Sequence, residues 1–254
     1  MSVSKAFSHG RAALIGYLPA GFPTVDKGID AMRAMVEAGV DAVEVGFPYS
    51  DPVMDGPVIQ RATETALAGG VRAADVLRTV EGVAEAGAPV LVMSYWNPIE
   101  RYGVDRFARD LASAGGAGLI TPDLIPDEAA EWIAAADEHR LDKVFLVSPS
   151  STDTRLAMTA GACRGFVYAT AVMGVTGARA ETSDAAPALV SRIRPVTGTP
   201  VAVGLGVRDG KQAATVGAYA DGVIVGSALV SALGDGGVDA VRSLSADLAA
   251  GVRG

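Results

Sequence analysis

Two apolar segments near the start of the chain, Ala13-Leu-Ile-Gly-Tyr-Leu18 and Ala42-Val-Glu-Val-Gly46, decide the fold class together with the pattern between them. Neither segment alternates cleanly between apolar and polar residues, which is typical of parallel strands that are buried on both faces. Between them, apolar residues recur every three or four positions from Val25 to Val36, and this spacing places them on one face of a helix. Thr24 is suited to cap the start of that helix, so the region predicts a strand–helix–strand unit.

The same unit recurs along the chain. We predict strands at Ala13–Leu18, Ala42–Gly46, Val90–Ser94, Ala117–Ile120, Lys143–Val147, Gly165–Tyr168, Pro200–Val203 and Gly222–Val225. Eight strands alternating with helices fit a closed barrel, which takes about 250 residues. An open doubly wound sheet would more often use fewer strands and a Gly-x-Gly-x-x-Gly turn after the first strand, where that spacing is absent. No linker divides the chain, so we expect a single (β/α)8 TIM barrel domain over residues 1–254.

The composition argues against several classes of protein. Lys and Arg number 21 and Asp and Glu number 29, for a net charge of −8, and without a basic run this argues against a nucleic acid partner. No apolar run approaches the roughly 18 residues of a membrane span, and the start lacks the apolar stretch of a signal peptide. We therefore expect no membrane attachment and a cytoplasmic location. The single cysteine, Cys163, excludes an internal disulfide and a cysteine-rich metal site, and we expect no metal.

Two gaps between predicted strand starts are long, from 42 to 90 and from 165 to 200. In a barrel, the extra residues after the second and sixth strands extend from the C-terminal face, where the active site is expected. Loops of this kind are candidates for lids that close over a substrate. We therefore expect residues 47–57 and 170–185 to border the site.

Acid–base chemistry in this chain must come from carboxylates, Tyr or Lys, because it has only two histidines, His9 and His139, which lie far apart in sequence. Glu44 lies inside an apolar strand, where an unpaired carboxylate is costly to bury. A partly apolar site would raise its pKa toward the range useful for proton transfer; the alternative is a structural carboxylate that accepts hydrogen bonds from loop amides. Asp51 and Asp55 follow on the next loop, where turn formation is an alternative for each residue alone. A strand-end carboxylate and a loop carboxylate together could divide acid, base and charge-stabilising roles.

Glycines gather at the ends of the last three predicted strands, at Gly174–Gly177, Gly204–Gly206 and Gly226. Glycine lets backbone N–H groups approach an anion closely, and Ser227 opens a predicted helix whose N-terminus favours negative charge. Phosphate sites in such barrels are commonly built from the loops after strands seven and eight plus a short helix. Ordinary tight turns are the alternative for any one cluster, but three in succession favour a phosphate site.

Three tyrosines, Tyr17, Tyr95 and Tyr168, fall near predicted strand ends. Tyr17 and Tyr95 could wall an aromatic pocket, and the hydroxyl of Tyr168 could face the barrel mouth. These positions predict a site that combines aromatic rings with the two kinds of carboxylate.

The chain resembles the tryptophan synthase alpha chain family over essentially its full length. The most specific match is the pattern Glu-x-Gly-x-Pro-x-Ser-Asp-Pro-x-x-Asp-Gly-Pro, which begins at Glu44. The matching segments are Tyr17–Thr24, Val43–Gln60, Gly118–Leu124, Gly174–Gly177 and Val203–Gly206. The resemblance implies a (β/α)8 barrel that cleaves indole-3-glycerol phosphate to indole and glyceraldehyde 3-phosphate by a retro-aldol reaction.

The resemblance also implies roles for individual residues. By motif position, Glu44 is similar to the general acid–base of the family, Asp55 to the carboxylate that partners the indole N–H, and Tyr168 to the neighbouring tyrosine. The remaining implied positions are Gly177, Gly206, Gly226 and Ser227 for phosphate, Thr176 with the tyrosines for the pocket, and Pro48 and Asp51 for the partner interface. The implied partner is a beta chain that carries pyridoxal phosphate, in an α2β2 heterotetramer, and no cofactor is implied in this chain.

Two alternatives stay open at this point. Another phosphate-binding barrel enzyme, acting on indole precursors or sugar phosphates, would account for the fold and the late glycines but not for the pattern that joins Glu44 to Asp55. A non-catalytic activator subunit would account for a partner interface, but the intact set of Glu44, Asp55 and Tyr168 argues against it.

Overall fold

Eight parallel strands close into a barrel in the computed structural model, which describes residues 2–170, 185–204 and 206–254. Each strand pairs with the next along the chain, and the last pairs with the first. The strands are β1 (Ala13–Pro19), β2 (Ala42–Gly46), β3 (Val90–Met93), β4 (Gly118–Thr121), β5 (Asp142–Val147), β6 (Val167–Thr170), β7 (Val201–Gly204) and β8 (Gly222–Val225). The predicted (β/α)8 TIM barrel is thus confirmed, and the observed strand bounds lie within two residues of the predicted ones.

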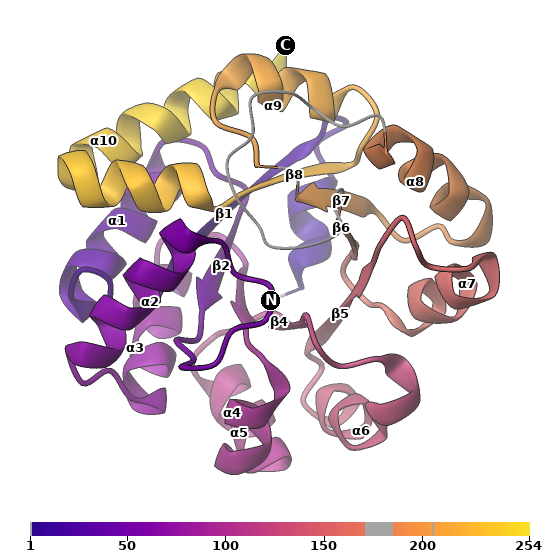
Figure 1. Ribbon diagram of the computed structural model, residues 1–254, viewed down its shortest axis with the longest axis horizontal. Coiled ribbons are helices and arrows are strands. Elements are labelled where there is room, and N and C mark those ends of the chain that lie inside the picture. Colours follow the sequence, from indigo (N-terminus) through magenta and orange to yellow (C-terminus); the bar gives the residue numbers. More distant parts are fainter. Residues whose placement is uncertain (1, 171–184, 205) are drawn as a thin grey trace.

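Helices surround the barrel as an outer ring (Figure 1). They are α1 (Val25–Glu37), α2 (Pro57–Ala68), α3 (Ala73–Ala84), α4 (Trp96–Tyr102), α5 (Val104–Ser113), α6 (Ala130–Glu138), α7 (Asp153–Ala162), α8 (Ala185–Ile193), α9 (Gly210–Gly217) and α10 (Ser227–Arg253), with 3-10 turns η1 (Val3–Phe7), η2 (Pro126–Glu128) and η3 (Arg194–Val196). Thr24 caps α1 as predicted, because its side chain accepts a hydrogen bond from the N–H of Lys27. Two helices, α2 and α3, account for much of the extra length between β2 and β3. Helix α10 has a kink at Gly237, whose φ of +67° is not helical.

Alternate strand residues face into the barrel, as the pleat requires. The register pairs Glu44 of β2 with Tyr17 of β1 on one side and with Leu91 of β3 on the other. On the opposite part of the barrel, Tyr168 of β6 pairs with Leu146 of β5. The inward side chains are therefore fixed in rows that run around the barrel, and Glu44 belongs to one of them.

The N-terminal 3-10 turn η1 closes one end of the barrel. Val3 and Ala6 belong to the same buried cluster as the inward residues of the strands. The carboxylate of Asp142, at the start of β5, accepts a hydrogen bond from the N–H of Val3 at 2.7 Å and holds the segment in place. Since β5 begins at this end, η1 forms the floor of the barrel and leaves the C-terminal ends of the strands as its mouth.

The sequence also predicted that the chain does not cross a membrane. Within the residues that the structure describes, none of the helices combines the length and the apolar character that a transmembrane span requires.

Candidate active site

Glu44 is buried in the barrel wall, because its strand residue faces inward among apolar neighbours. Its exposed fraction is 0%, and neither carboxylate oxygen has a hydrogen-bond partner among the residues described. The alternative of a structural carboxylate bound to loop amides is therefore contradicted for these residues. A buried carboxylate without partners is costly, which is typical of a group kept for chemistry.

Burial also sets the protonation of Glu44. Removing the carboxylate from water disfavours its charged form and raises the pKa from 4.5 to about 8. Near neutral pH the side chain is largely protonated, and a modest change of its surroundings can release the proton. These are the properties of a group that can act as a general acid and then as a general base.

Asp55 lies on the loop between β2 and α2, just ahead of Gly56, which occupies the N-cap position of α2. Its Oδ1 accepts a hydrogen bond of 3.3 Å from the hydroxyl of Tyr95. Burial raises the pKa of Asp55, and the hydrogen bond from Tyr95 opposes that rise. The two acids thus differ in environment, since Asp55 has a donor that favours its ionised form and Glu44 has none among the described residues.

The tyrosines show that these groups form one cluster. Burial is the largest cause of the raised pKa of Tyr17, and the charges of Asp55 and Glu44 add to it. The same two carboxylates, with burial again first, raise the pKa of Tyr168. The two acids and the two inward tyrosines therefore lie within electrostatic reach of one another, while Tyr95 contacts the Asp55 side of the cluster.

Glycines at the strand ends make room for these rings. A side-chain carbon at Gly46 would overlap the hydroxyl of Tyr17, and one at Gly204 would lie 2.7 Å from the hydroxyl of Tyr168. At Gly226 it would lie 3.3 Å from the Tyr17 ring. Sequence reasoning missed this packing role of Gly46 and Gly204. The signal was a glycine at the end of each strand, where the neighbouring strand carries an inward tyrosine.

Part of the predicted phosphate site lies at the same end of the barrel. Gly226 precedes α10 without a side-chain cap, and Ser227 begins that helix, so backbone N–H groups of its first turn lack helical acceptors. Gly206 has a φ of +72°, a left-handed conformation that suits glycine. Gly226 lies beside the ring of Tyr17, and Tyr17 in turn interacts with Asp55 and Glu44. The start of α10 is therefore close to the cluster of acids and tyrosines. The predicted residues Thr176 and Gly177 lie outside the described residues.

The two predicted interface residues lie on the loop that leads to Asp55. Pro48 is buried within the chain and Asp51 is exposed. Sequence reasoning missed Val53, an apolar side chain with an exposed fraction of 70%. The signal would have been its place in Asp51-Pro52-Val53-Met54-Asp55, where turn-forming residues on both sides put an apolar residue on a surface loop.

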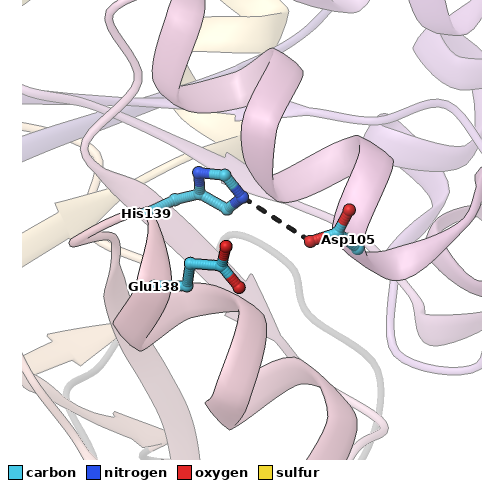
Figure 2. A group of neighbouring side chains, drawn as sticks. All are labelled: Asp105, Glu138 and His139. Carbon is cyan, nitrogen blue, oxygen red and sulfur yellow. Dashed lines mark ion pairs between the residues drawn. The ribbon is translucent and has the colours of Figure 1, made fainter.

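One group of side chains in the described part of the chain has the residue types of a metal site. Figure 2 shows Asp105, Glu138 and His139 between the start of α5 and the end of α6, with ligand atoms within 4.8 Å of one another. His139 Nε2 is 3.6 Å from Asp105 Oδ1, as in an ion pair. The group lies on the outer ring of helices, apart from Glu44 and Asp55, so it contributes nothing to the chemistry of the barrel mouth.

Comparison with known proteins shows the family to which this fold belongs. The profile of the family described as tryptophan synthase alpha chain matches residues 3–250. A tryptophan synthase alpha chain of Salinispora arenicola is 67% identical, over 100% of this chain and 97% of the relative. A tryptophan synthase structure from Mycobacterium tuberculosis has a TM-score of 0.94 at 62% identity, covering 99% of this chain and 96% of that one. An alpha chain structure from Legionella pneumophila has a TM-score of 0.88 at 31% identity, covering 99% and 95%.

Proposed function

This chain belongs to the tryptophan synthase alpha chain family, and we propose that Glu44, Asp55 and Tyr168 carry out its reaction at the barrel mouth. The alpha chain is a lyase that cleaves indole-3-glycerol phosphate. The observation that carries the assignment is the burial of Glu44 without a hydrogen-bond partner among the described residues. The rival of an unrelated phosphate-binding barrel enzyme is not supported, because the family match spans residues 3–250.

The cleavage needs one proton donated and one removed. Protonated Glu44 would deliver a proton to C3 of the indole ring, which leaves a positive charge on the ring. The bond between C3 and the side chain then breaks, its electron pair restores the aromatic ring, and the adjacent hydroxyl loses its proton to become the aldehyde of glyceraldehyde 3-phosphate. If Glu44 accepts that second proton, the residue ends in its starting form, and a pKa of about 8 suits both steps.

Asp55 has a different task in this proposal. Positive charge develops at the ring nitrogen when C3 is protonated, and an ionised carboxylate opposite that N–H stabilises it or takes its proton. The hydrogen bond from Tyr95 favours the ionised form of Asp55. Tyr168, near both carboxylates, would contact the reacting part of the substrate.

The remaining predicted residues would bind the two ends of the substrate. Backbone N–H groups at Gly206, Gly226 and Ser227 would hold the phosphate, with Gly177 as a fourth position, and the helix start at Ser227 supports this. The indole ring would lie in a pocket walled by Tyr17, Tyr95 and Thr176.

The family also indicates a partner, the beta chain of tryptophan synthase. We propose an α2β2 assembly in which the loop that carries Pro48 and Asp51 meets the beta chain through its exposed residues, and in which pyridoxal phosphate belongs to the beta chain. Asp51 and Val53 are exposed on that loop, so their side chains are accessible to a partner. We further propose that residues 1–254 act as one barrel domain and that the complex works in the cytoplasm.

The test is the substitution Glu44→Gln, which keeps the size of the side chain and removes its titratable proton. Turnover of indole-3-glycerol phosphate, measured as indole release in complex with the beta chain, should fall at least about 100-fold. Glu64→Gln, at an exposed position of α2, is the matched control and should keep wild-type turnover.

Two results would contradict the proposal. Indole release by Glu44→Gln within a few fold of wild type would remove Glu44 from the chemistry. If that variant also stimulated the beta chain normally, the chain would act as the activator subunit considered above.

A further inference from the structure

The hydroxyl of Tyr95 connects three consecutive residues of the loop that carries Asp55. It accepts hydrogen bonds from the backbone N–H groups of Val53, at 3.2 Å, and Met54, at 2.9 Å. It donates one to Asp55 Oδ1, at 3.3 Å. One phenol oxygen therefore uses both its acceptor capacity and its single proton on this loop.

The loop needs such an anchor, because its outer side is open to water. Asp51 is exposed and the exposed fraction of Val53 is 70%. The carbonyl of Asp55 is held by the side-chain amide of Gln60 at 2.8 Å, but that bond fixes the backbone and leaves the carboxylate free to rotate. Among the residues described, Tyr95 provides the hydrogen bond that fixes the direction of the carboxylate.

Tyr95 is itself held on rigid elements. It lies two residues after the end of β3 and occupies the N-cap position of α4, and its exposed fraction is 6%. The next residue, Trp96, donates its backbone N–H to the carboxylate of Asp123 at 2.9 Å. The ring of Tyr49 packs against the Tyr95 ring with 5.4 Å between centroids. A side chain fixed in this way can impose its position on a loop that is less constrained.

We propose that Tyr95 is a positioning residue, which holds the Asp55 carboxylate in the direction required to meet the indole N–H. This inference rests on the role proposed for Asp55 and adds to the pocket role predicted for Tyr95. Its effect passes through Asp55, so its loss should lower kcat more than it raises KM.

The test is a double-mutant cycle with Tyr95→Phe and Asp55→Asn, measured as indole release in the complex with the beta chain. We expect Tyr95→Phe to lower kcat about 10-fold, the size expected for a lost hydrogen bond to a charged group, and Asp55→Asn to lower it about 100-fold. Because the first effect acts through Asp55, the double variant should be no slower than Asp55→Asn alone. Independent roles would multiply to about 1000-fold.

Tyr49→Phe is the matched control. It removes a neighbouring hydroxyl for which no hydrogen bond is found among the described residues, and it keeps the ring that packs on Tyr95. We expect wild-type kcat and KM for Tyr49→Phe. For Tyr95→Phe we expect a cooperative thermal unfolding transition, which shows that this variant is folded.

The pH profile gives a readout that a purely structural role would not move. Among the residues that the structure describes, Tyr95, Tyr17 and Tyr168 interact with Asp55, and Glu44 interacts with the latter two tyrosines. Tyr95 donates the hydrogen bond that lowers the pKa of Asp55. Removing that donor should raise this pKa and shift the acidic limb of kcat to higher pH. The alkaline limb, which Glu44 sets, should stay in place.

The outcomes separate the inference from the function it rests on. A double variant about 10-fold slower than Asp55→Asn, or an unmoved acidic limb in Tyr95→Phe, would overturn the positioning role while leaving Asp55 in the chemistry. Wild-type turnover in Asp55→Asn would overturn the role of Asp55 itself, and the inference with it.

Discussion

Replacing Glu44 by glutamine should make the protein more stable at alkaline pH while it removes the activity. The carboxyl has a pKa of about 8 in the folded protein, against 4.5 for the unperturbed group. Below pH 4.5 it is protonated in both the folded and the unfolded state and its ionisation costs nothing. As the pH rises, the unfolded chain releases the proton first, so the unfolded state gains stability until Glu44 also ionises in the fold.

The size of the effect follows from the two pKa values. Each unit of difference is worth about 1.4 kcal/mol, so the cost of Glu44 is about 1 kcal/mol at pH 5, about 3 at pH 7 and at most about 5 at pH 9. Glutamine keeps the shape and polarity but cannot ionise. The difference in the free energy of unfolding between Glu44→Gln and wild type should therefore rise with pH along this curve.

Urea unfolding at several pH values, followed by circular dichroism, measures this difference. Contributions from all other titrating groups cancel between the two proteins, and Glu64→Gln should show no trend with pH. A difference that stays constant from pH 5 to pH 9 would refute the reasoning, because it would mean that the fold does not perturb the ionisation of Glu44.

Three further results should follow. Gly204→Ala would place a carbon 2.7 Å from the Tyr168 hydroxyl and 3.0 Å from its ring, where ordinary contact begins at 3.4 Å. It should destabilise the fold by about 1–3 kcal/mol in urea unfolding, whereas Gly198→Ala, with open space around it, should not. An equal cost in a Tyr168→Ala background, which removes the ring, would contradict the contact. The kcat of the complex should fall above about pH 8 as Glu44 ionises, and a flat alkaline profile would exclude it as the proton donor. Gly206→Asp should raise KM about tenfold or more, since its charge would oppose the phosphate, and an unchanged KM would place the phosphate elsewhere.

The strands could be predicted from sequence because their physical cause is local. A strand buried on both faces by the barrel core and the helices must be apolar along its length, and that pattern is visible at Ala42–Gly46 without knowledge of the partner strands. The extra helix α2 was harder to predict: Pro57 marks its first position, but Gly56 ahead of it offers no capping side chain.

The same distinction between local and long-range causes decides which residues of the candidate site could be predicted. Glu44 could be found from sequence, because a carboxylate inside an apolar strand conflicts with its immediate surroundings. The link between Tyr95 and Asp55 joins residues that are 40 positions apart, and nothing in either segment alone points to the other. The need for Gly204 likewise depends on a ring carried by β6 that reaches across to β7.

The floor of the barrel has a consequence for the order in which the protein can assemble. The ring of Phe7 packs 5.7 Å from that of Phe166, whose centroid is 6.3 Å from that of Tyr168. Phe7 is synthesised long before Phe166 and thus receives this partner only when β6 has been made. Until then η1 lacks its contact with Phe166, and the stack of rings that reaches Tyr168 is completed late in biosynthesis.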